Sequence, residues 1–574
     1  MNDDFDLVIR GGTVVDGTGA APVEADVAVA GGRIAAVGRV AGRGREEIDA
    51  RGLVVTPGFI DLHTHFDGQV TWEHRLLPVS GHGVTTAIIG NCGVGFAPCR
   101  PEDRDRLMRL MEGVEDIPHD VLGAGLPWNW SSYPEYLDAL AARGFDMDVG
   151  TLVPHSPLRV YVMGERGVAC EPATAADIEA MARLVREAVQ AGALGFGSSR
   201  LRDQRSSAGG NIPSLGAAED ELTAIAAAMG TAHRGVVQMA IDFNLFPSAI
   251  EELEMMVRLA RASGRPVMYS LKQSNREPEG WRRLLEITER ANRDGVRVLP
   301  QVLGRPTGAI MSLESSVHPF SRCPSFAPLA RATFAERLAT MRDPAMRATL
   351  IREAGIAQER MPVQARGFRL MFPLDDPPDY EPALDTSVQA QAERRGADVF
   401  EHVYDLLLER DGRRQLLLAG GNYAQGNLDA ALGMMRCEYS VPGLGDAGAH
   451  ASIVCDASAT TFMLSYWARD RVRGERLPLE RVVRALTRDS AAAIGLPARG
   501  VLAPGLRADI NVIDHARLRL RAPKTVYDLP GGGRRLVQQA EGYRATIVNG
   551  QIAIRDDAPT GTLPGRLVRG AAAA

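Results

Sequence analysis

The chain has 574 residues, a net charge of −6, and 45% hydrophobic and 24% charged residues. These values are typical of a soluble globular protein of about two to four domains. They argue against a nucleic-acid-binding protein, because phosphate recognition needs an excess or a stripe of positive charge. No apolar stretch approaches the roughly 20 residues of a membrane-spanning helix, and the acidic N-terminus does not resemble a secretory signal.

The cysteines and lysines narrow the chemistry further. The six cysteines are dispersed without a CxxC pair, which argues against a disulfide framework and, with the N-terminus, predicts a cytoplasmic protein. Arginine supplies 63 of the 65 basic residues, and the two lysines are Lys272 and Lys524. Chemistry that requires a lysine therefore has two candidates.

The first 56 residues read as short strands separated by glycine turns. Apolar and polar residues alternate in runs such as DLVIRGG and RIAAVG, and GG and DG pairs offer turn positions with positive φ. This pattern predicts a small antiparallel sheet. The segment 496–574 has the same texture in GVLAPGLRADINVID and RATIVNGQIAIRD. We expect residues 1–56 and 496–574 to form one small β-sandwich domain from both chain ends.

Residues 57–495 follow a different rhythm, in which apolar strands alternate with amphipathic helices such as AADIEAMARLVREAVQAGA. Alternation of this kind indicates parallel βαβ units, and about eight such strands predict an α/β fold, a distorted (β/α)8 TIM-type barrel. The interval 304–416 is rich in proline and aromatic residues and too long for a simple loop. It predicts an inserted lid or subdomain over the barrel mouth.

The strongest local signal for chemistry is His63-Thr64-His65, at the end of the run PGFIDL. Residues i and i+2 of a strand share a face, so both imidazoles can point into one cavity. Active sites of barrels lie at the carboxyl ends of the strands, and imidazole is a common zinc ligand. The alternative is a pair of partly exposed histidines at a strand end.

Two further residues end candidate strands. Cys92 closes TTAIIGNC, where a thiolate would be a soft zinc ligand; a buried core cysteine is the alternative. Asp446 ends the last candidate strand in GLGDAGAH, where a carboxylate could be a general base or a metal ligand. Its alternative is a helix cap. His450 follows four residues later and is a candidate for substrate contact.

In combination, PGFIDLHTH, GNCGVG, ALGFGSS, GLGDAGAHASIVCDAS and the tail DLPGGGRRLVQ resemble the amidohydrolase superfamily, and within it the N-acyl-D-amino-acid deacylase (D-aminoacylase) group. The resemblance extends over nearly the whole chain. It implies a distorted barrel with one or two metal ions, usually zinc, that hydrolyses N-acyl-D-amino acids to a carboxylate and a free D-amino acid.

The resemblance assigns His63, His65 and Cys92 as metal ligands, and Asp446 as the catalytic aspartate and a further ligand. The family also carries a histidine on the fifth strand and another on the sixth, but this chain reads VVQMAIDFN and VMYSLKQSN there. The residues standing near those positions are Gln238, Asp242, Ser270 and Leu271. Because none of these residues is a histidine, the resemblance favours one zinc ion over two.

The lysine count bears on the same point. Many two-metal amidohydrolases bridge their ions with a carbamylated lysine, usually on the fourth strand, and no lysine lies near ALGFGSS. Lys524 falls in the C-terminal tail, and Lys272 falls two strands later. The resemblance therefore favours Cys92 as a bridging or single-site ligand, and Lys272 remains open as a substrate or metal contact.

Four residues are candidates for substrate binding: His155, Arg200, Lys272 and His450. His155 ends the third candidate strand, and Arg200 and Lys272 follow later strands, where either cation could hold a substrate carboxylate. The expected partner is a small molecule, with neither nucleic acid nor membrane; a homo-oligomer is left open.

The sequence thus predicts a metal-dependent hydrolase of a carbon–nitrogen bond other than a peptide bond. Two alternatives remain. The enzyme could hydrolyse a cyclic amide, a small peptide or another amidated metabolite. Loss of the two family histidines would also suit a barrel that has become a non-catalytic scaffold, although His63, His65, Cys92 and Asp446 together oppose that interpretation.

Overall fold

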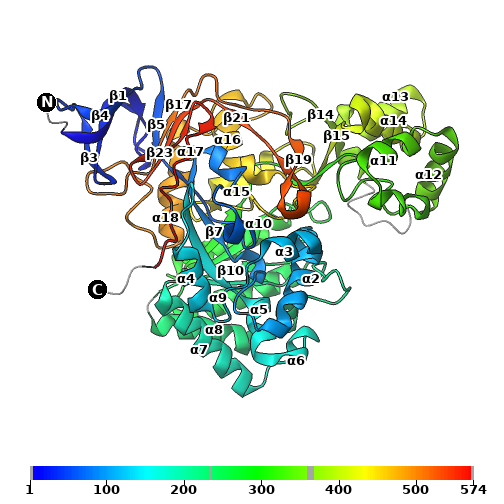
Figure 1. Ribbon diagram of the computed structural model, residues 1–574, viewed down its shortest axis with the longest axis horizontal. Helices are drawn as coiled ribbons and strands as arrows, with labels where there is room; N and C mark the ends of the chain where they lie inside the picture. The colour runs from blue at the N-terminus through cyan, green and yellow to red at the C-terminus, as the bar shows by residue number, and fades with distance from the viewer. Residues whose placement is uncertain (1–3, 233, 358–366, 571–574) are drawn as a thin grey trace.

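A computed structural model of the protein describes residues 4–232, 234–357 and 367–570. Figure 1 shows a central barrel with its helices below, a β domain at one side built from both chain ends, and a lobe of helices projecting at the opposite side. The barrel and the contributions of both ends to one β domain confirm the predicted fold class.

The barrel consists of eight parallel strands in chain order. Its last strand lies beside the first: Thr64 forms a parallel bridge to Ala447, and the His65 amide donates to the Ala447 carbonyl at 2.7 Å. The sheet is therefore nearly closed. Its strands are β6 (Phe59–Asp61), β7 (Val84–Ile89), β8 (Asp148–Pro154), β9 (Gly195–Ser199), β10 (Val236–Ala240), β11 (Val267–Leu271), β12 (Val298–Val302) and β16 (Val441–Pro442).

Amphipathic helices cover the outside of the barrel. The longest, α7 (Ala175–Ala191), begins at a capping box in which Thr174 and Asp177 exchange hydrogen bonds, and ends before Gly192. Its Met181 and Val185 are fully buried, as an apolar stripe facing a core requires. The other helices that pack around the strands are α4 (Tyr133–Ala141), α5 (His155–Met163), α6 (Glu165–Val168), α8 (Glu219–Thr231), α9 (Ser248–Ser263), α10 (Gly280–Arg293) and α15 (Asp429–Arg436).

Other helices line the connections of the barrel. The long connection between β7 and β8 carries two of them ahead of α4. These connecting helices are α1 (Gln69–Trp72), α2 (Arg104–Glu115), α3 (His119–Gly125), α16 (Ala459–Phe462), α17 (Leu479–Arg484) and α18 (Ser490–Ala493).

The two chain ends meet in one nine-stranded mixed sheet. Its N-terminal strands are β1 (Phe5–Val14), β2 (Val23–Ala30), β3 (Arg33–Gly38), β4 (Gly44–Asp49) and β5 (Val54–Pro57), and its C-terminal strands are β17 (Ile510–Ile513), β22 (Tyr543–Val548), β23 (Gln551–Arg555) and β24 (Ala558–Pro559). β17 pairs antiparallel with β5 and joins the two ends. The sequence predicted an antiparallel sheet, but β4 and β5 pair parallel with β1, because the chain crosses back to β1 after the hairpins end.

Two short two-stranded sheets complete the C-terminal part: β18 (Arg519–Leu520) with β21 (Ala540–Glu541), and β19 (Lys524–Leu529) with β20 (Gly533–Val537). The second of them reaches the barrel mouth, where the Leu536 amide donates to the Ala451 carbonyl at 2.7 Å.

The segment between β12 and β16 forms a lobe with its own apolar core, which includes Phe320, Met341 and Tyr404. Figure 1 shows its helices standing away from the barrel. Its three-stranded antiparallel sheet adjoins the mouth, since the Ile310 amide donates to the Ile453 carbonyl at 2.7 Å. The lobe contains β13 (Thr307–Met311), β14 (Met371–Leu374), β15 (Gln415–Gly421), α11 (Phe334–Met341), α12 (Pro344–Ala357), α13 (Val388–Arg395) and α14 (Val399–Gly412).

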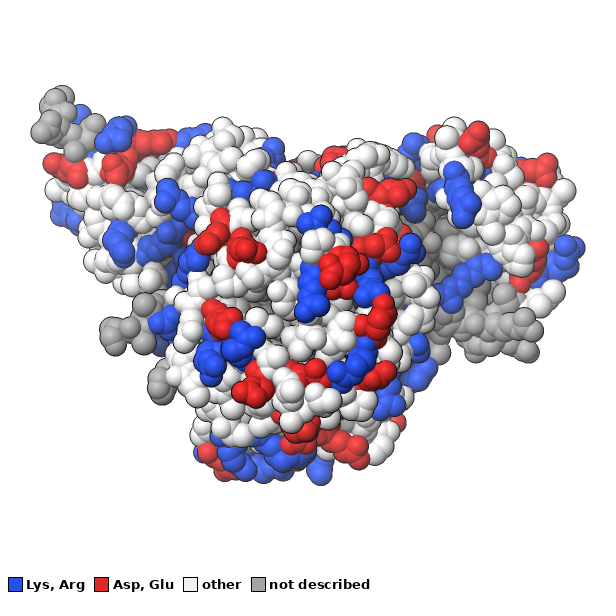
Figure 2. Space-filling view, turned by 60° about the horizontal axis from the view of Figure 1, so that its bottom comes forward, with Lys and Arg blue, Asp and Glu red and all other residues white. Residues whose placement is uncertain are grey.

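Charges of both signs are interspersed on the face shown in Figure 2. Ion pairs such as Arg258 with Glu219 and Arg290 with Glu254 link neighbouring barrel helices at 2.8 and 2.7 Å. Across the described residues, no helix combines the length and the apolar character that crossing a membrane would need.

Candidate metal centre at the barrel mouth

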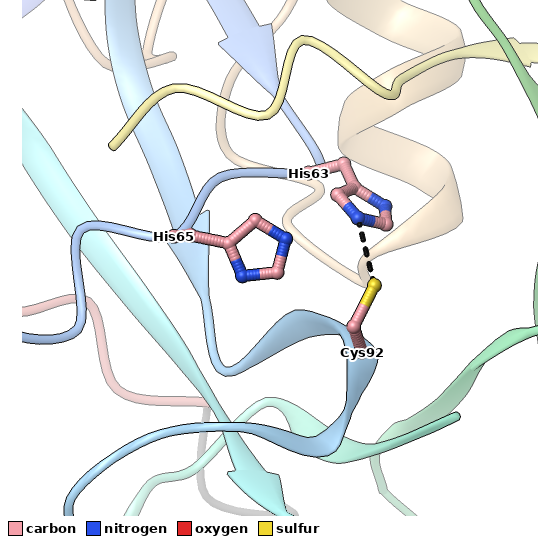
Figure 3. Close-up of side chains that lie close together, drawn as sticks. All are labelled: His63, His65 and Cys92. Atoms are coloured by element: carbon pink, nitrogen blue, oxygen red, sulfur yellow. Dashed lines mark hydrogen bonds between the residues drawn. The ribbon is translucent and has the colours of Figure 1, made fainter. Parts of the chain in front are cut away.

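His63 and His65 lie just beyond the carboxyl end of β6, inside the mouth of the barrel. Their side chains are buried, and their rings are 5.3 Å apart between centroids. Together with Cys92 they form a cluster in which one ligand atom of each residue lies within 4.8 Å of the others. Figure 3 shows the two imidazoles and the thiol converging from two neighbouring strand ends. The shared face of the HxH motif and the strand-end cysteine thus meet in space.

A tight turn after β7 directs the Cys92 thiol into this cluster. Gly90 has φ +83°, and a Cβ there would lie 2.0 Å from the Leu152 carbonyl oxygen, so glycine is required for the close approach. Cys92 itself has a left-handed φ of 52°. Its Sγ lies 3.3 Å from His63 Nε2.

Asp446 faces both histidines from the loop after β16. Its Oδ1 is 3.3 Å from His63 Nε2 and 3.8 Å from His65 Nε2, and its side chain is 30% exposed. The Asp446 amide donates to the His63 carbonyl at 3.1 Å, so barrel closure sets this position. Both Nε2 atoms therefore point towards one carboxylate that remains accessible to solvent.

The outer nitrogens of the two rings face other acceptors. His63 Nδ1 is 2.9 Å from Gln301 Oε1 on β12. His65 Nδ1 is 3.3 Å from Glu115 Oε1, at the end of α2. A proton on each Nδ1 would leave each Nε2 lone pair free towards Asp446, the arrangement that metal-binding histidines need.

Sequence reasoning missed Gln301 and Glu115. Strand alternation could have found Gln301, a polar residue within the apolar run VRVLPQV. For Glu115 no local signal existed, since it is one of several acidic residues in a helix outside the barrel strands.

The electrostatics of the site favour a bound cation. Burial raises the pKa of Asp61 to about 7 and that of Asp67 to about 8. Burial, and then the neighbouring carboxylates of Glu115 and Asp446, raise the pKa of the Cys92 thiol well above its usual value. Burial also lowers the pKa of His65, followed by the effects of His63 and His450. Acidic groups crowded into a poorly solvated site are stabilised by a positive ion.

The donor set fits zinc. Two imidazole nitrogens, one thiol sulfur and one carboxylate oxygen are ligands that Zn²⁺ accepts in tetrahedral sites. All four groups come from strand ends at one side of the mouth, from β6, β7 and the loop after β16.

The other side of the mouth carries no histidine on β10 or β11. Gln238 of β10 accepts the Cys92 amide proton at 2.9 Å and donates to Gln301 at 3.5 Å, so it supports the cluster through hydrogen bonds. Ser270 of β11 is buried, and its Oγ has no hydrogen-bond partner among the described residues. Asp242 accepts from the Asn244 amide in the next turn, and Leu271 is buried in the core.

Lys272 directly follows β11 and is half-buried. Burial raises the pKa of Cys92 and of Asp456, and the positive charge of Lys272 opposes this rise at both groups. Its Nζ lies 5.9 Å from the centre of the Phe243 ring. No carboxylate of the described residues forms an ion pair with it, so it offers an uncommitted cation near the cluster.

The remaining predicted substrate contacts are placed differently. His155 is fully buried, with Nδ1 2.9 Å from Ser198 Oγ and Nε2 2.8 Å from Glu221 Oε1. Arg200 forms an ion pair with Glu252 of α9 at 3.0 Å. These two side chains are engaged by protein groups. His450, in contrast, is 40% exposed and lies at the mouth, 3.9 Å from Glu115.

Comparisons with known proteins agree with this architecture. A family model described as "Amidohydrolase family" matches residues 46–554. An N-acyl-D-aspartate deacylase of Alcaligenes xylosoxydans xylosoxydans is 39% identical over 204 residues, 35% of this chain and 38% of the relative. A D-aminoacylase of the same organism is 37% identical over 193 residues, 33% of this chain and 37% of the relative. The matched segments thus span well under half of these relatives.

Among solved structures, a D-aminoacylase is similar over 98% of this chain and 100% of its own, with a TM-score of 0.65 and 25% sequence identity. That enzyme is described as having a binuclear metal centre with one-metal activation and second-metal attenuation.

Proposed function

Because the chain belongs to the amidohydrolase family, we propose that it is a metal-dependent hydrolase of a non-peptide carbon–nitrogen bond, and specifically an N-acyl-D-amino-acid deacylase. One observation carries the proposal: Nε2 of His63 and Nε2 of His65 both face Asp446 Oδ1, with the Cys92 thiol beside them. The deacylase names of the matched relatives support the substrate class.

His63, His65, Cys92 and Asp446 are the residues that would hold the ion, which we propose to be zinc. When bound, zinc supplies a Lewis acid that polarises the amide carbonyl and makes water more acidic. We propose a single ion, because β10 and β11 contribute no histidine and because one metal activates the solved D-aminoacylase.

Asp446 is the proposed general base and acid. Its carboxylate is the accessible one of the cluster, so it can accept a proton from the attacking water and deliver it to the departing amine. Lys272 is the proposed contact for the substrate carboxylate, since its ammonium group is near the cluster and unpaired among the described residues. His450 borders the same opening.

The test combines metal analysis with a substrate panel. We expect about one zinc per chain, and release of free D-amino acid from N-acetyl and longer N-acyl-D-amino acids. Hydrolysis of cyclic imides alone would replace the deacylase assignment with ring opening. Protein without metal and without hydrolysis of either class would overturn the proposal and favour a scaffold.

A further inference from the structure

We propose that Glu115, the last residue of α2, is a positioning residue for the metal centre, holding the His65 ring so that Nε2 faces the ion. This inference rests on the proposed function, because it concerns the same site. It assigns a role to a carboxylate that reaches the mouth from outside the barrel strands.

Glu115 is delivered to the site by a well-anchored helix. α2 buries Leu107, Leu110, Met111 and Val114 in the main core. Glu115 follows on the same side and is 2% exposed. A surface position for this carboxylate would cost nothing, whereas its burial is unfavourable without a compensating partner. Burial, and then the nearby carboxylates of Asp446 and Asp67, raise the pKa of Glu115 well above its usual value. The helix therefore holds a carboxyl group where packing alone would favour an apolar one.

The partners of that carboxylate are histidines of the mouth. Glu115 Oε1 lies 3.3 Å from His65 Nδ1, and Oε2 lies 3.9 Å from His450 Nε2. Within the described parts of the chain, no arginine or lysine nitrogen pairs with Glu115. His65 Nδ1 has no aligned hydrogen bond there either. A small rotation of the ring would let Nδ1–H donate to Oε1, and no competing acceptor has to be displaced.

The residue after Glu115 fixes the end of α2 to the rest of the mouth. Asp116 Oδ2 accepts hydrogen bonds from Ser316 Oγ at 2.6 Å and Ser452 Oγ at 2.8 Å. Ser316 belongs to the inserted lobe and Ser452 to the loop after β16. Three segments far apart in the sequence therefore meet at the point from which Glu115 extends.

Glu115 and Gln301 each face the Nδ1 atom of one histidine of the cluster, Glu115 with a carboxyl group and Gln301 with a neutral amide. Gln301 Oε1 lies 2.9 Å from His63 Nδ1 and can fix the tautomer of that ring with a neutral amide. Glu115 would do the same for His65 with a carboxyl oxygen, and its ionised form, with a cation bound, would also make the imidazole a stronger ligand. Partners of this kind change metal affinity by roughly 10- to 100-fold.

The test measures zinc affinity by competition with a chelating dye, which needs no substrate. For Glu115→Ala we expect zinc binding weakened by roughly 10- to 100-fold. Glu115→Gln should recover part of this loss, because its amide oxygen can still accept from Nδ1–H. Glu102→Gln, an exposed carboxylate just before the same helix, is the matched control and should bind zinc as the wild type does.

Melting of the metal-free proteins separates positioning from a structural role. Positioning predicts that Glu115→Ala melts no lower than wild type without metal, since a buried carboxylate has been removed. A lower melting temperature with equal zinc loss in the Ala and Gln variants would overturn the proposal. So would a zinc affinity of Glu115→Ala within about twofold of a zinc-binding wild type. If wild-type protein binds no zinc, the metal centre of the proposed function fails first, and this inference with it.

Discussion

The two sides of the barrel mouth differ in what their strands contribute. The side of β6, β7 and the loop after β16 carries His63, His65, Cys92 and Asp446. The side of β10 and β11 carries Gln238, which is paired with Met268, and Ser270, two residues further towards the mouth, with Lys272 just beyond β11. One side therefore carries the four side chains that we propose as metal ligands, and the other carries hydrogen-bonding groups and a positive charge. The difference teaches that the side chains of His63, His65, Cys92 and Asp446 cluster in this barrel although its fifth and sixth strands contribute no histidine.

Replacement of Asp446 should have the largest effect on the side of the mouth that carries the proposed ligands. Asp446→Asn should lower kcat by roughly 10²- to 10⁴-fold, because an amide cannot accept the proton of the attacking water. Steady-state kinetics on an N-acyl-D-amino acid measures this, with zinc content determined alongside. Asp242→Asn, at the opposite side after β10, is the control and should retain most activity. Unchanged turnover and unchanged zinc in Asp446→Asn would refute the assigned role.

Removal of the Cys92 thiol should have the next largest effect. Cys92→Ala deletes a proposed direct ligand, so zinc affinity should fall by more than the roughly 10- to 100-fold that a hydrogen-bond partner of a ligand contributes. Cys99→Ala, another buried cysteine, should leave zinc affinity unchanged. Equal affinities of the two variants would show that the cluster binds its ion through the histidines and Asp446 alone.

Adding a histidine to the other side would sharpen the comparison. Ser270 is buried on β11, and its hydroxyl has no partner among the described residues. Ala240 ends β10 two residues after Gln238, on the same face of the strand. Ala240→His combined with Ser270→His should raise the zinc content from about one to about two ions per chain, because the two added imidazoles supply donors for a second ion. Elemental analysis measures the zinc content. The control is the single variant Ser270→Ala, which leaves Ala240 unchanged and adds no imidazole. A count that stays at one would mean that the two sides differ in more than these side chains.

Strand periodicity accounts for most of the site that could be predicted. Residues i and i+2 of a strand share a face. This rule predicted that His63 and His65 would point into one cavity, and in the structure their rings lie side by side. Placement at strand ends made Cys92 and Asp446 candidates, and the family resemblance grouped them with the histidines. In the structure the four side chains lie close together.

The residues that escaped prediction reach the site by tertiary packing. Glu115 extends from a helix in the long β7–β8 connection, and its contact with His65 depends on where that helix docks. His155 shows the opposite case: it follows a barrel strand, yet its ring turns to Glu221 of α8. The local sequence pattern predicts where a strand ends. The direction of the side chain that follows the strand depends on how the next helix packs.

Replacement of Lys272 tests whether the side of the mouth formed by β10 and β11 binds the substrate carboxylate. Lys272→Met should lower kcat/KM by roughly 10- to 100-fold, mainly through KM, because a hydrogen bond between charged groups contributes about 1.5–3 kcal/mol. Lys524→Met, the other lysine of the chain and exposed on β19, is the control. An N-acyl-D-amino acid whose carboxylate has been converted to an amide should be hydrolysed equally by wild type and Lys272→Met. Equal loss on both substrates would mean that Lys272 does not bind the carboxylate.

The smallest expected effect lies outside the mouth, where a local rule of helix formation accounts for the structure by itself. Asp177 belongs to the capping box of α7. Its partial burial alone would raise its pKa, but hydrogen bonds from Arg166 and Thr174 lower it to about 2. A folded-state pKa below the unfolded value of about 3.9 contributes stability above that value, and the contribution is lost as pH falls towards 2. Asp177→Asn removes a negative charge from the first turn of α7 and should therefore cost about 0.3–1 kcal/mol at pH 7, and the difference from wild type should shrink in melts run from pH 5 down to pH 3. Zinc affinity and kcat should stay unchanged, because neither side of the mouth is touched; a change in either would show that the outer helices also set the geometry of the ligand cluster.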